Sequence, residues 1–284
     1  MSNNNEGERP LILFTNDDGI ESPGLWAAVG AFADIGELLV VAPREQQSGM
    51  GRSMPRHLDG RIHEYPPKIE VPHIRTYAVD ASPAQAVQHG VIELAGRKPA
   101  LVVSGINYGE NMGNGVTISG TVGAALEGAS LGVPSLAVSQ QTPTELHLSY
   151  SSDVDFTAAA HFTRKFGLWL IENRNLPDDV DVLKIDVPWG ATPDTDWRIT
   201  RISRRRVYWP TRPERVALGD AGQMGYEYRA DPSQAEPNSD VYAVSHDKVV
   251  SVSPMSLDMT SRTDLYRLQL ILAGRLRYRG ENGA

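Results

Sequence analysis

The chain has 284 residues, 40 % of them hydrophobic, and a formal net charge of −8 at pH 7. This acidic balance argues against a dedicated binder of duplex DNA, which needs a basic surface, and the absence of cysteine excludes disulfides, thiolate catalysis and zinc–thiolate sites. No run approaches the ~20 apolar residues of a membrane span, and residues 1–10 lack the apolar segment of a secretory signal. We therefore expect a cytoplasmic protein that contacts neither nucleic acid nor membrane.

The first predicted element is a strand that runs directly into a pair of aspartates. Apolar residues 11–14 are followed by a polar segment that includes Asn16, Asp17, Asp18 and Gly19. The apolar run predicts a strand buried on both faces, as in a parallel sheet, whose carboxyl end is where such sheets bind ligands. Two adjacent carboxylates repel each other unless a positive group compensates them, and Mg²⁺ or Mn²⁺ prefers such oxygen ligands. The alternative is an ordinary strand that ends in an Asp-Gly turn.

A helix and a second strand come next. The spacing of apolar residues predicts a helix over 25–34, and the apolar run at 38–42 predicts a strand that completes a parallel βαβ unit. The polar loop at 44–53 then emerges at the same edge of the sheet as the aspartates. Ser48 in this loop is a candidate hydroxyl ligand, although a surface loop of small residues is the alternative interpretation.

The middle of the chain contains a dense group of glycines. We expect a β excursion over 62–79, a helix from Ser82 to about 94 and a third strong strand at 100–104. Residues 105–132 then hold eight of the 26 glycines. Because glycine lets consecutive backbone amides turn toward one point, this loop is a candidate anion site.

The glycine-rich loop ends at the start of an Ala-rich helix, which begins after Ser119, Gly120 and Thr121. The free amides and positive dipole end of a helix N-terminus favour a phosphate group there. The alternative is a glycine-rich loop with an ordinary Ser or Thr cap. The candidate contacts to a phosphate group or substrate in these segments are Asn16, Ser104, Gly105, Asn111, Ser119, Gly120 and Thr121.

Strands and helices alternate as far as about residue 190, which is typical of an α/β core. From residue 193 the pattern changes to short alternating segments, with the basic run Arg204–Arg206 close to Trp209. We expect a Rossmann-like catalytic core over 10–190 and a β-rich appendage with a tail over 191–284, used in oligomerisation. Nucleic-acid contact through the basic run is a weaker alternative, given the acidic total charge.

The sequence resembles the SurE survival-protein nucleotidases. The resemblance covers roughly residues 10–140, and two motifs at matching positions make it specific. The matching segments are Thr15–Ile20, Ala42–Pro43, Gln47–Gly49, Val103–Asn111 and Ser119–Ala125.

This resemblance implies a phosphomonoesterase that acts on nucleoside 5′-monophosphates, and on their 3′ isomers or polyphosphate as further substrates. It implies that Asp17, Asp18, Ser48 and Asn107 hold one divalent cation per subunit, Mg²⁺ or Mn²⁺. It also implies a homodimer or homotetramer with exchanged C-terminal elements. The chain departs from the family pattern in two places: Ile118 replaces an aromatic residue, and Gln85 with Ala86 replaces an Asp-Cys pair.

For the mechanism, we expect the cation to polarise the phosphoryl oxygens and activate water. Amides of the glycine-rich loop, together with Ser119 and Thr121, would stabilise the phosphoryl charge, and Asn111 would orient it. Direct attack by an aspartate stays open. A haloacid-dehalogenase-like phosphatase is one rival, but its two aspartates are separated by one residue, whereas Asp17 and Asp18 are adjacent. A nucleotide-sensing module without turnover is the other.

Overall fold

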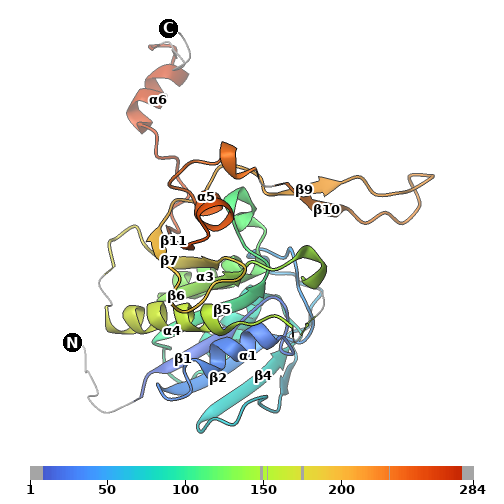
Figure 1. The fold of residues 1–284 in the computed structure, drawn as a ribbon, viewed down its shortest axis with the longest axis vertical. Helices are drawn as coiled ribbons and strands as arrows, with labels where there is room; N and C mark the ends of the chain where they lie inside the picture. Colours follow the sequence, from blue (N-terminus) through green and yellow to red (C-terminus); the bar gives the residue numbers. More distant parts are fainter. Residues whose placement is uncertain (1–8, 148–149, 152, 174–175, 230, 277–284) are drawn as a thin grey trace.

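The computed structural model describes residues 9–147, 150–151, 153–173, 176–229 and 231–276. In these residues a nine-stranded, mostly parallel sheet has the order β3-β4-β2-β1-β5-β6-β7-β11-β8, and β9 pairs with β10 in a separate hairpin (Figure 1). The strands are β1 Leu11–Thr15, β2 Glu37–Pro43, β3 Ile62–Glu64, β4 Ile74–Val79, β5 Leu101–Tyr108, β6 Ser135–Gln140, β7 Val182–Val187, β8 Trp197–Ile199, β9 Tyr208–Thr211, β10 Gly225–Tyr228 and β11 Val250–Met255.

Helices cover both faces of the sheet, which confirms the expected α/β class. Side chains of α1 and α4 pack on one face, and side chains of α2 and α3 pack on the other. The helices are α1 Pro23–Gly30, α2 Pro83–Gln88, α3 Gly120–Ser130, α4 Thr157–Glu172, α5 Asp240–Tyr242 and α6 Leu265–Leu272, with single turns η1 His89–Leu94, η2 Gly113–Thr117, η3 Thr144–Leu146, η4 Pro232–Gln234 and η5 Ala243–Asp247.

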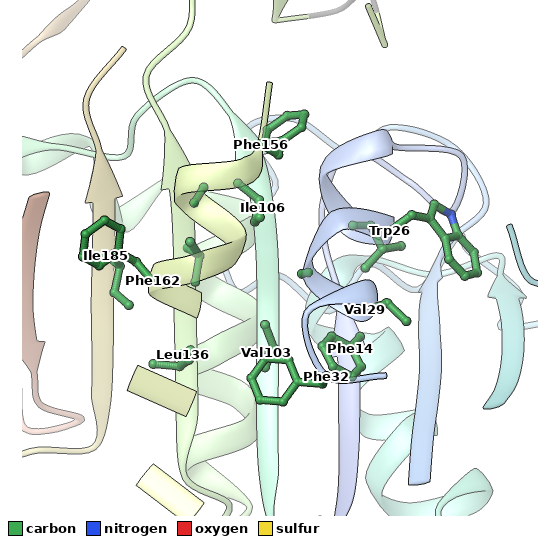
Figure 2. Packing of buried hydrophobic residues seen from close by; sticks show 14 of the residues in the cluster. Phe14, Trp26, Val29, Phe32, Val103, Ile106, Leu136, Phe156, Phe162 and Ile185 are labelled. Atoms are coloured by element: carbon green, nitrogen blue, oxygen red, sulfur yellow. The ribbon is translucent and has the colours of Figure 1, made fainter. Parts of the chain in front are cut away.

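The core follows from the alternation of side chains along β1. Ile12 and Phe14 face α1 and α4, whereas Leu11 and Leu13 face α2 and α3. Figure 2 shows the cluster on the α1 and α4 face, in which the rings of Phe14 and Phe32 pack edge to face with their centroids 5.6 Å apart. Burying each such side chain contributes about 1.5–3 kcal/mol. This two-sided burial holds the carboxyl end of β1 in a fixed place.

The strand order creates a switch point at β1. The chain passes from β1 to β2 and β4 on one side, and then crosses to β5 and β6 on the other. Where the connections on the two sides leave in opposite directions, doubly wound sheets bind their ligands in a crevice at the carboxyl ends of the two central strands. The Asp17–Asp18 pair lies at this end of β1.

The central sheet continues beyond residue 190. Strand β11 pairs antiparallel with β7, and β8 pairs parallel with β11, so both lie in the same sheet as β1. The division into a core and an oligomerisation appendage at that residue stays a prediction. No helix of the described residues is long and apolar enough to cross a membrane.

Candidate active site

Asn16 shapes the turn that carries the two aspartates. Its side-chain amide donates to the Gly19 carbonyl at 3.0 Å, and the Gly19 amide donates back to Asn16 Oδ1 at 3.2 Å. Gly19 takes a φ of +96°, which L side chains rarely adopt. The predicted substrate contact Asn16 is thus used for a local turn, and this turn directs Asp17 and Asp18 into the crevice.

Asp17 lies against the N-terminus of α3. Its carboxyl is 6 % exposed and accepts a hydrogen bond from the Thr121 hydroxyl. Burial raises the pKa of Asp17, and the Thr121 hydroxyl with the amides of Thr121 and Gly120 lowers it in part. A side chain at Gly120 would have its Cβ only 2.6 Å from the Asp17 Cβ, so glycine is required for this approach. The predicted helix N-terminus therefore faces the predicted acid directly.

Asp18 is held from the other side of the crevice. It is 2 % exposed, and it accepts hydrogen bonds at 3.2 Å from the amide of Tyr108 at the end of β5 and from Gln46 Nε2. Burial, together with the negative charge of Asp17, raises the pKa of Asp18 well above its ordinary value. Two carboxyls in this state are poised to take up a cation, because a bound positive charge would stabilise both ionised forms.

The other two predicted metal ligands lie beside this pair. The amide of Gln47 donates to the Asp17 carbonyl at 2.7 Å, which brings the exposed Ser48 to the edge of the crevice. Asn107 precedes Tyr108, and its Nδ2 donates to the carbonyls of Tyr108 and Gly109 at 3.2 and 2.8 Å. The Asn107 amide nitrogen is thereby used by the backbone, and its Oδ1 is the atom that suits a metal.

The donors around the crevice fit a hard divalent cation. In the described residues no lysine or arginine lowers the pKa of Asp17 or Asp18, so no side chain neutralises the pair. No three histidine, cysteine or acidic side chains of that part of the chain group together as a metal site. A cation here would therefore rely on the hydroxyl of Ser48 and the amide oxygen of Asn107 besides the two carboxylates, an all-oxygen set.

The sequence and fold comparisons identify the family. A family model described as "Survival protein SurE" matches residues 12–208. The chain belongs to the SurE family. It is 41 % identical to a protein named 5′-nucleotidase SurE of Thermococcus gammatolerans, over 93 % of this chain and 96 % of that one, and 38 % identical to one of the same name from Thermococcus kodakarensis, over 92 % and 98 %. The haloacid-dehalogenase alternative is therefore wrong.

A solved SurE structure has the same fold. The crystal structure of the SurE protein from Aquifex aeolicus matches with a TM-score of 0.70 and 28 % sequence identity, over 93 % of this chain and 98 % of that chain. The resemblance inferred from motifs in residues 10–140 thus extends over most of the chain.

The glycine-rich SurE loop uses some of its amides for the protein itself. The amide of Asn111 donates to Asp186 Oδ1 at 2.8 Å, and the amide of Gly113 donates to Asp240 Oδ2 at 3.1 Å. These two groups are thus not free for an anion, contrary to the general expectation for the loop. The Asn111 side chain donates to Ser139 Oγ at 2.8 Å.

The remaining predicted contacts have distinct local positions. Ser119 is the N-cap of α3, because its hydroxyl accepts from the Val122 amide at 3.1 Å. Ser104 is buried on β5, and its hydroxyl has no hydrogen-bond partner in the described residues. Gly105 has a φ of +123° and lies against the carbonyl of Val138, so this bend of β5 requires glycine. The amides of Gly120 and Thr121, at the start of α3, are directed at the Asp17 carboxyl.

The two departures from the SurE pattern have structural explanations. Gln85 forms a capping box with Ser82, in which the Gln85 amide donates to Ser82 Oγ at 3.2 Å and the Ser82 amide donates to Gln85 Oε1 at 3.1 Å. Ile118 is 60 % exposed, and its carbonyl accepts from the Gly51 amide at 3.0 Å. Ile118 therefore presents an apolar side chain at the rim between the Ser48 loop and α3.

Two side chains that contact Asp18, those of Gln46 and Tyr150, were not predicted. Gln46 donates to Asp18 and also to the His147 carbonyl at 3.2 Å, and the Tyr150 hydroxyl donates to the Asp18 carbonyl. The signal for Gln46 was present, since it lies two residues before Ser48. Nothing in the sequence pattern around His147 and Tyr150 distinguishes them, because they reach the site from more than a hundred residues away.

Proposed function

We propose that this protein is a divalent-metal-dependent 5′-nucleotidase that hydrolyses nucleoside 5′-monophosphates to nucleoside and phosphate. The observation that carries the proposal is the pair of adjacent, buried carboxyls at the switch point, with the N-terminus of α3 against one of them. Relatives that match over nine-tenths of the chain are named 5′-nucleotidases, which supports the same substrate class.

Four oxygen donors would hold the cation: the carboxylates of Asp17 and Asp18, the hydroxyl of Ser48 and the amide oxygen of Asn107. When bound, Mg²⁺ or Mn²⁺ supplies a Lewis acid that polarises a phosphoryl oxygen and makes water a better nucleophile. The protein orients Asp18 through hydrogen bonds to both carboxyl oxygens, since Gln46 Nε2 donates to Oδ1 and the Tyr108 amide donates to Oδ2.

The start of α3 stabilises negative charge. In the free protein, Asp17 accepts the Thr121 hydroxyl, and the amides of Gly120 and Thr121 lower its pKa. With the Asp17 carboxylate serving as a metal ligand, the Thr121 hydroxyl and these two amides would donate hydrogen bonds to a phosphoryl oxygen, and the helix dipole would add to the attraction. We propose water as the nucleophile. Direct attack by water would invert the configuration at phosphorus in a substrate with an isotopically chiral phosphate, whereas two displacements through an aspartyl phosphate would give net retention.

The decisive experiment measures phosphate release from AMP and GMP. Release that requires Mn²⁺ or Mg²⁺ and stops in EDTA supports the proposal. Asp18→Asn should abolish turnover while the protein stays folded, and Asp178→Asn, at an exposed position before β7, should retain full activity. Full Mg²⁺-dependent activity of Asp18→Asn would refute the assignment. We also propose activity on nucleoside 3′-monophosphates and polyphosphate, and the same assay with 3′-AMP and polyphosphate tests it.

A nucleotide-sensing module is the second candidate, and the exposed Ile118 at the rim of the crevice is the observation behind it. An apolar side chain at this position would change the surface around the nucleoside part of the substrate. Calorimetry that shows tight AMP binding, with no phosphate released in the presence of either cation, would favour this candidate over the enzyme.

We also propose that the protein forms a homodimer or homotetramer through its C-terminal segment. Tyr266 and Leu272 on α6 are 70 % and 79 % exposed, and Leu265 is exposed beside them. Such an apolar surface on a short helix favours a second copy of the chain. Light scattering should give a lower mass for Leu272→Glu than for the matched polar substitution Gln269→Glu, and equal masses would contradict this proposal.

A further inference from the structure

Three fully buried charged side chains form a cluster beneath the glycine-rich loop. Lys184 and Asp186 lie two residues apart on β7 and so point to the same face, and Asp240 is the first residue of α5. Lys184 forms an ion pair with Asp186 and another with Asp240, the latter at 3.2 Å. Burying three charges is costly unless each is paired and hydrogen-bonded, so the further partners of this cluster are informative.

Those further partners are backbone groups of the loop. Asp186 Oδ1 accepts from the Asn111 amide at 2.8 Å, and Lys184 Nζ donates to the Asn111 carbonyl at 3.0 Å. Asp240 Oδ2 accepts from the Gly113 amide at 3.1 Å. The cluster therefore binds both the amide and the carbonyl of Asn111, and it also binds the amide of Gly113 in the same loop.

The cluster also joins the loop to the C-terminal part of the chain. Asp240 Oδ1 accepts from the Ser203 amide at 2.9 Å, so one carboxylate contacts both segments. The amide of Asn114 donates to the Arg205 carbonyl at 3.0 Å, which places the start of the basic run against the loop. Residues that are distant in sequence thus determine where Asn111 lies relative to the crevice.

We propose that Lys184, Asp186 and Asp240 are positioning residues for the substrate phosphate, acting through the backbone of Asn111 and Gly113 without touching the substrate. The inference rests on the proposed function and on the role expected for Asn111 from the sequence, which is to orient the phosphoryl group. Apolar side chains could fill the same volume, often with no loss of stability. They could not orient individual peptide groups, because dispersion contacts have little directionality, whereas each carboxylate–amide bond fixes a direction.

Asp186→Asn tests the role with little change in volume. The carboxylate uses one oxygen for the Asn111 amide and the other for Lys184, whereas asparagine offers a single oxygen and must lose one contact. The readouts are KM for AMP and competitive inhibition by inorganic phosphate, both with Mn²⁺ and well below the unfolding temperature. We expect KM and the phosphate inhibition constant to rise about tenfold to a hundredfold. Mn²⁺ affinity should not change, because the cluster contacts none of the proposed metal ligands.

A matched control separates positioning from stability. Phe162 on α4 is buried in the core cluster that it shares with Leu183 and Ile185 of β7, on the opposite face of the sheet from Lys184 and Asp186. Phe162→Leu should lower the unfolding temperature because it leaves a cavity, while phosphate inhibition stays within about twofold of the wild-type value.

A phosphate inhibition constant for Asp186→Asn within about twofold of wild type would overturn the inference, while the nucleotidase proposal would stand. If Asp186→Asn does not fold, Lys184→Met is assayed in the same way. It keeps both carboxylates, loses the contact with the Asn111 carbonyl and should also weaken phosphate inhibition. A wild-type protein that neither releases phosphate from AMP nor binds inorganic phosphate would refute the proposed function itself.

Discussion

Glu110 offers a sharp test of the electrostatics next to the site. Its carboxyl is buried beneath the loop, and one of its oxygens has no hydrogen-bond partner in the described residues. Burial, with a smaller effect from the Asp186 carboxylate, raises the pKa of Glu110 from its ordinary value of 4.5 to about 7, although hydrogen bonds from Tyr208 and Gln141 oppose the rise. Glu110→Gln removes the ionisable group and keeps an oxygen that can accept from the Tyr208 hydroxyl.

The sign and size of the effect follow from proton linkage. Below pH 4.5 the carboxyl is protonated in both the folded and the unfolded state. Between pH 4.5 and about 7 only the folded state keeps the proton, so the free energy of unfolding falls as pH rises, and above that range the loss is complete. Since a tenfold change in proton affinity is worth about 1.4 kcal/mol, the full loss is on the order of 3 kcal/mol.

Urea unfolding at pH 4 and pH 8, in EDTA, measures this contribution. Glu110→Gln should match the wild type at pH 4 and exceed its free energy of unfolding by about 3 kcal/mol at pH 8. The exposed Glu145→Gln is the control and should follow the wild type at both values. Equal stability of Glu110→Gln and wild type at pH 8 would show that Glu110 ionises without cost, and the account of the buried carboxyl would be wrong.

Three further substitutions test individual contacts. Gly120→Ala should lower the free energy of unfolding by about 1–3 kcal/mol and reduce turnover strongly, because the new Cβ would lie 2.6 Å from the Asp17 Cβ. Gly115→Ala is the control, since nothing lies within 4 Å of its new Cβ. Equal kinetics of the two variants would contradict the prediction. Gln85→Ala should lower the free energy of unfolding by about 1 kcal/mol through loss of the capping box, with turnover retained, and an unchanged urea midpoint would speak against that role. Asp18→Asn should be more stable than wild type in EDTA at neutral pH, because it removes one of two adjacent buried carboxyls, and a less stable variant in urea unfolding would show that the pair is not strained.

The elements with strong local patterns were predicted closely. The apolar run before Asn16 forms β1, and the predicted segment at 38–42 forms β2, which extends one residue further at each end. The helix predicted to about residue 94 is divided into α2 and a wider turn, η1. Such local elements depend on side-chain periodicity and capping, which can be read from a few neighbouring residues.

The roles of individual loop groups could not be predicted in this way. The glycine content indicated a loop whose amides converge, but two of those amides donate to Asp186 and Asp240. A signal was available in residues 182–187, because Lys184 and Asp186 are charged residues in an otherwise apolar run. Their partner Asp240 is more than fifty residues further on, and no local pattern connects it to them.

The sequence by itself determined the α/β class, the family and the place of the two aspartates at the end of the first strand, because these depend on short-range patterns and on motif spacing. Only the tertiary structure decided that β11 and β8 extend the sheet past residue 190, that the N-terminus of α3 meets Asp17, and that a buried lysine with two carboxylates holds the glycine-rich loop. The physical reason is that strand pairing and the satisfaction of buried charges are non-local: each depends on which distant groups the folded core brings within hydrogen-bond distance.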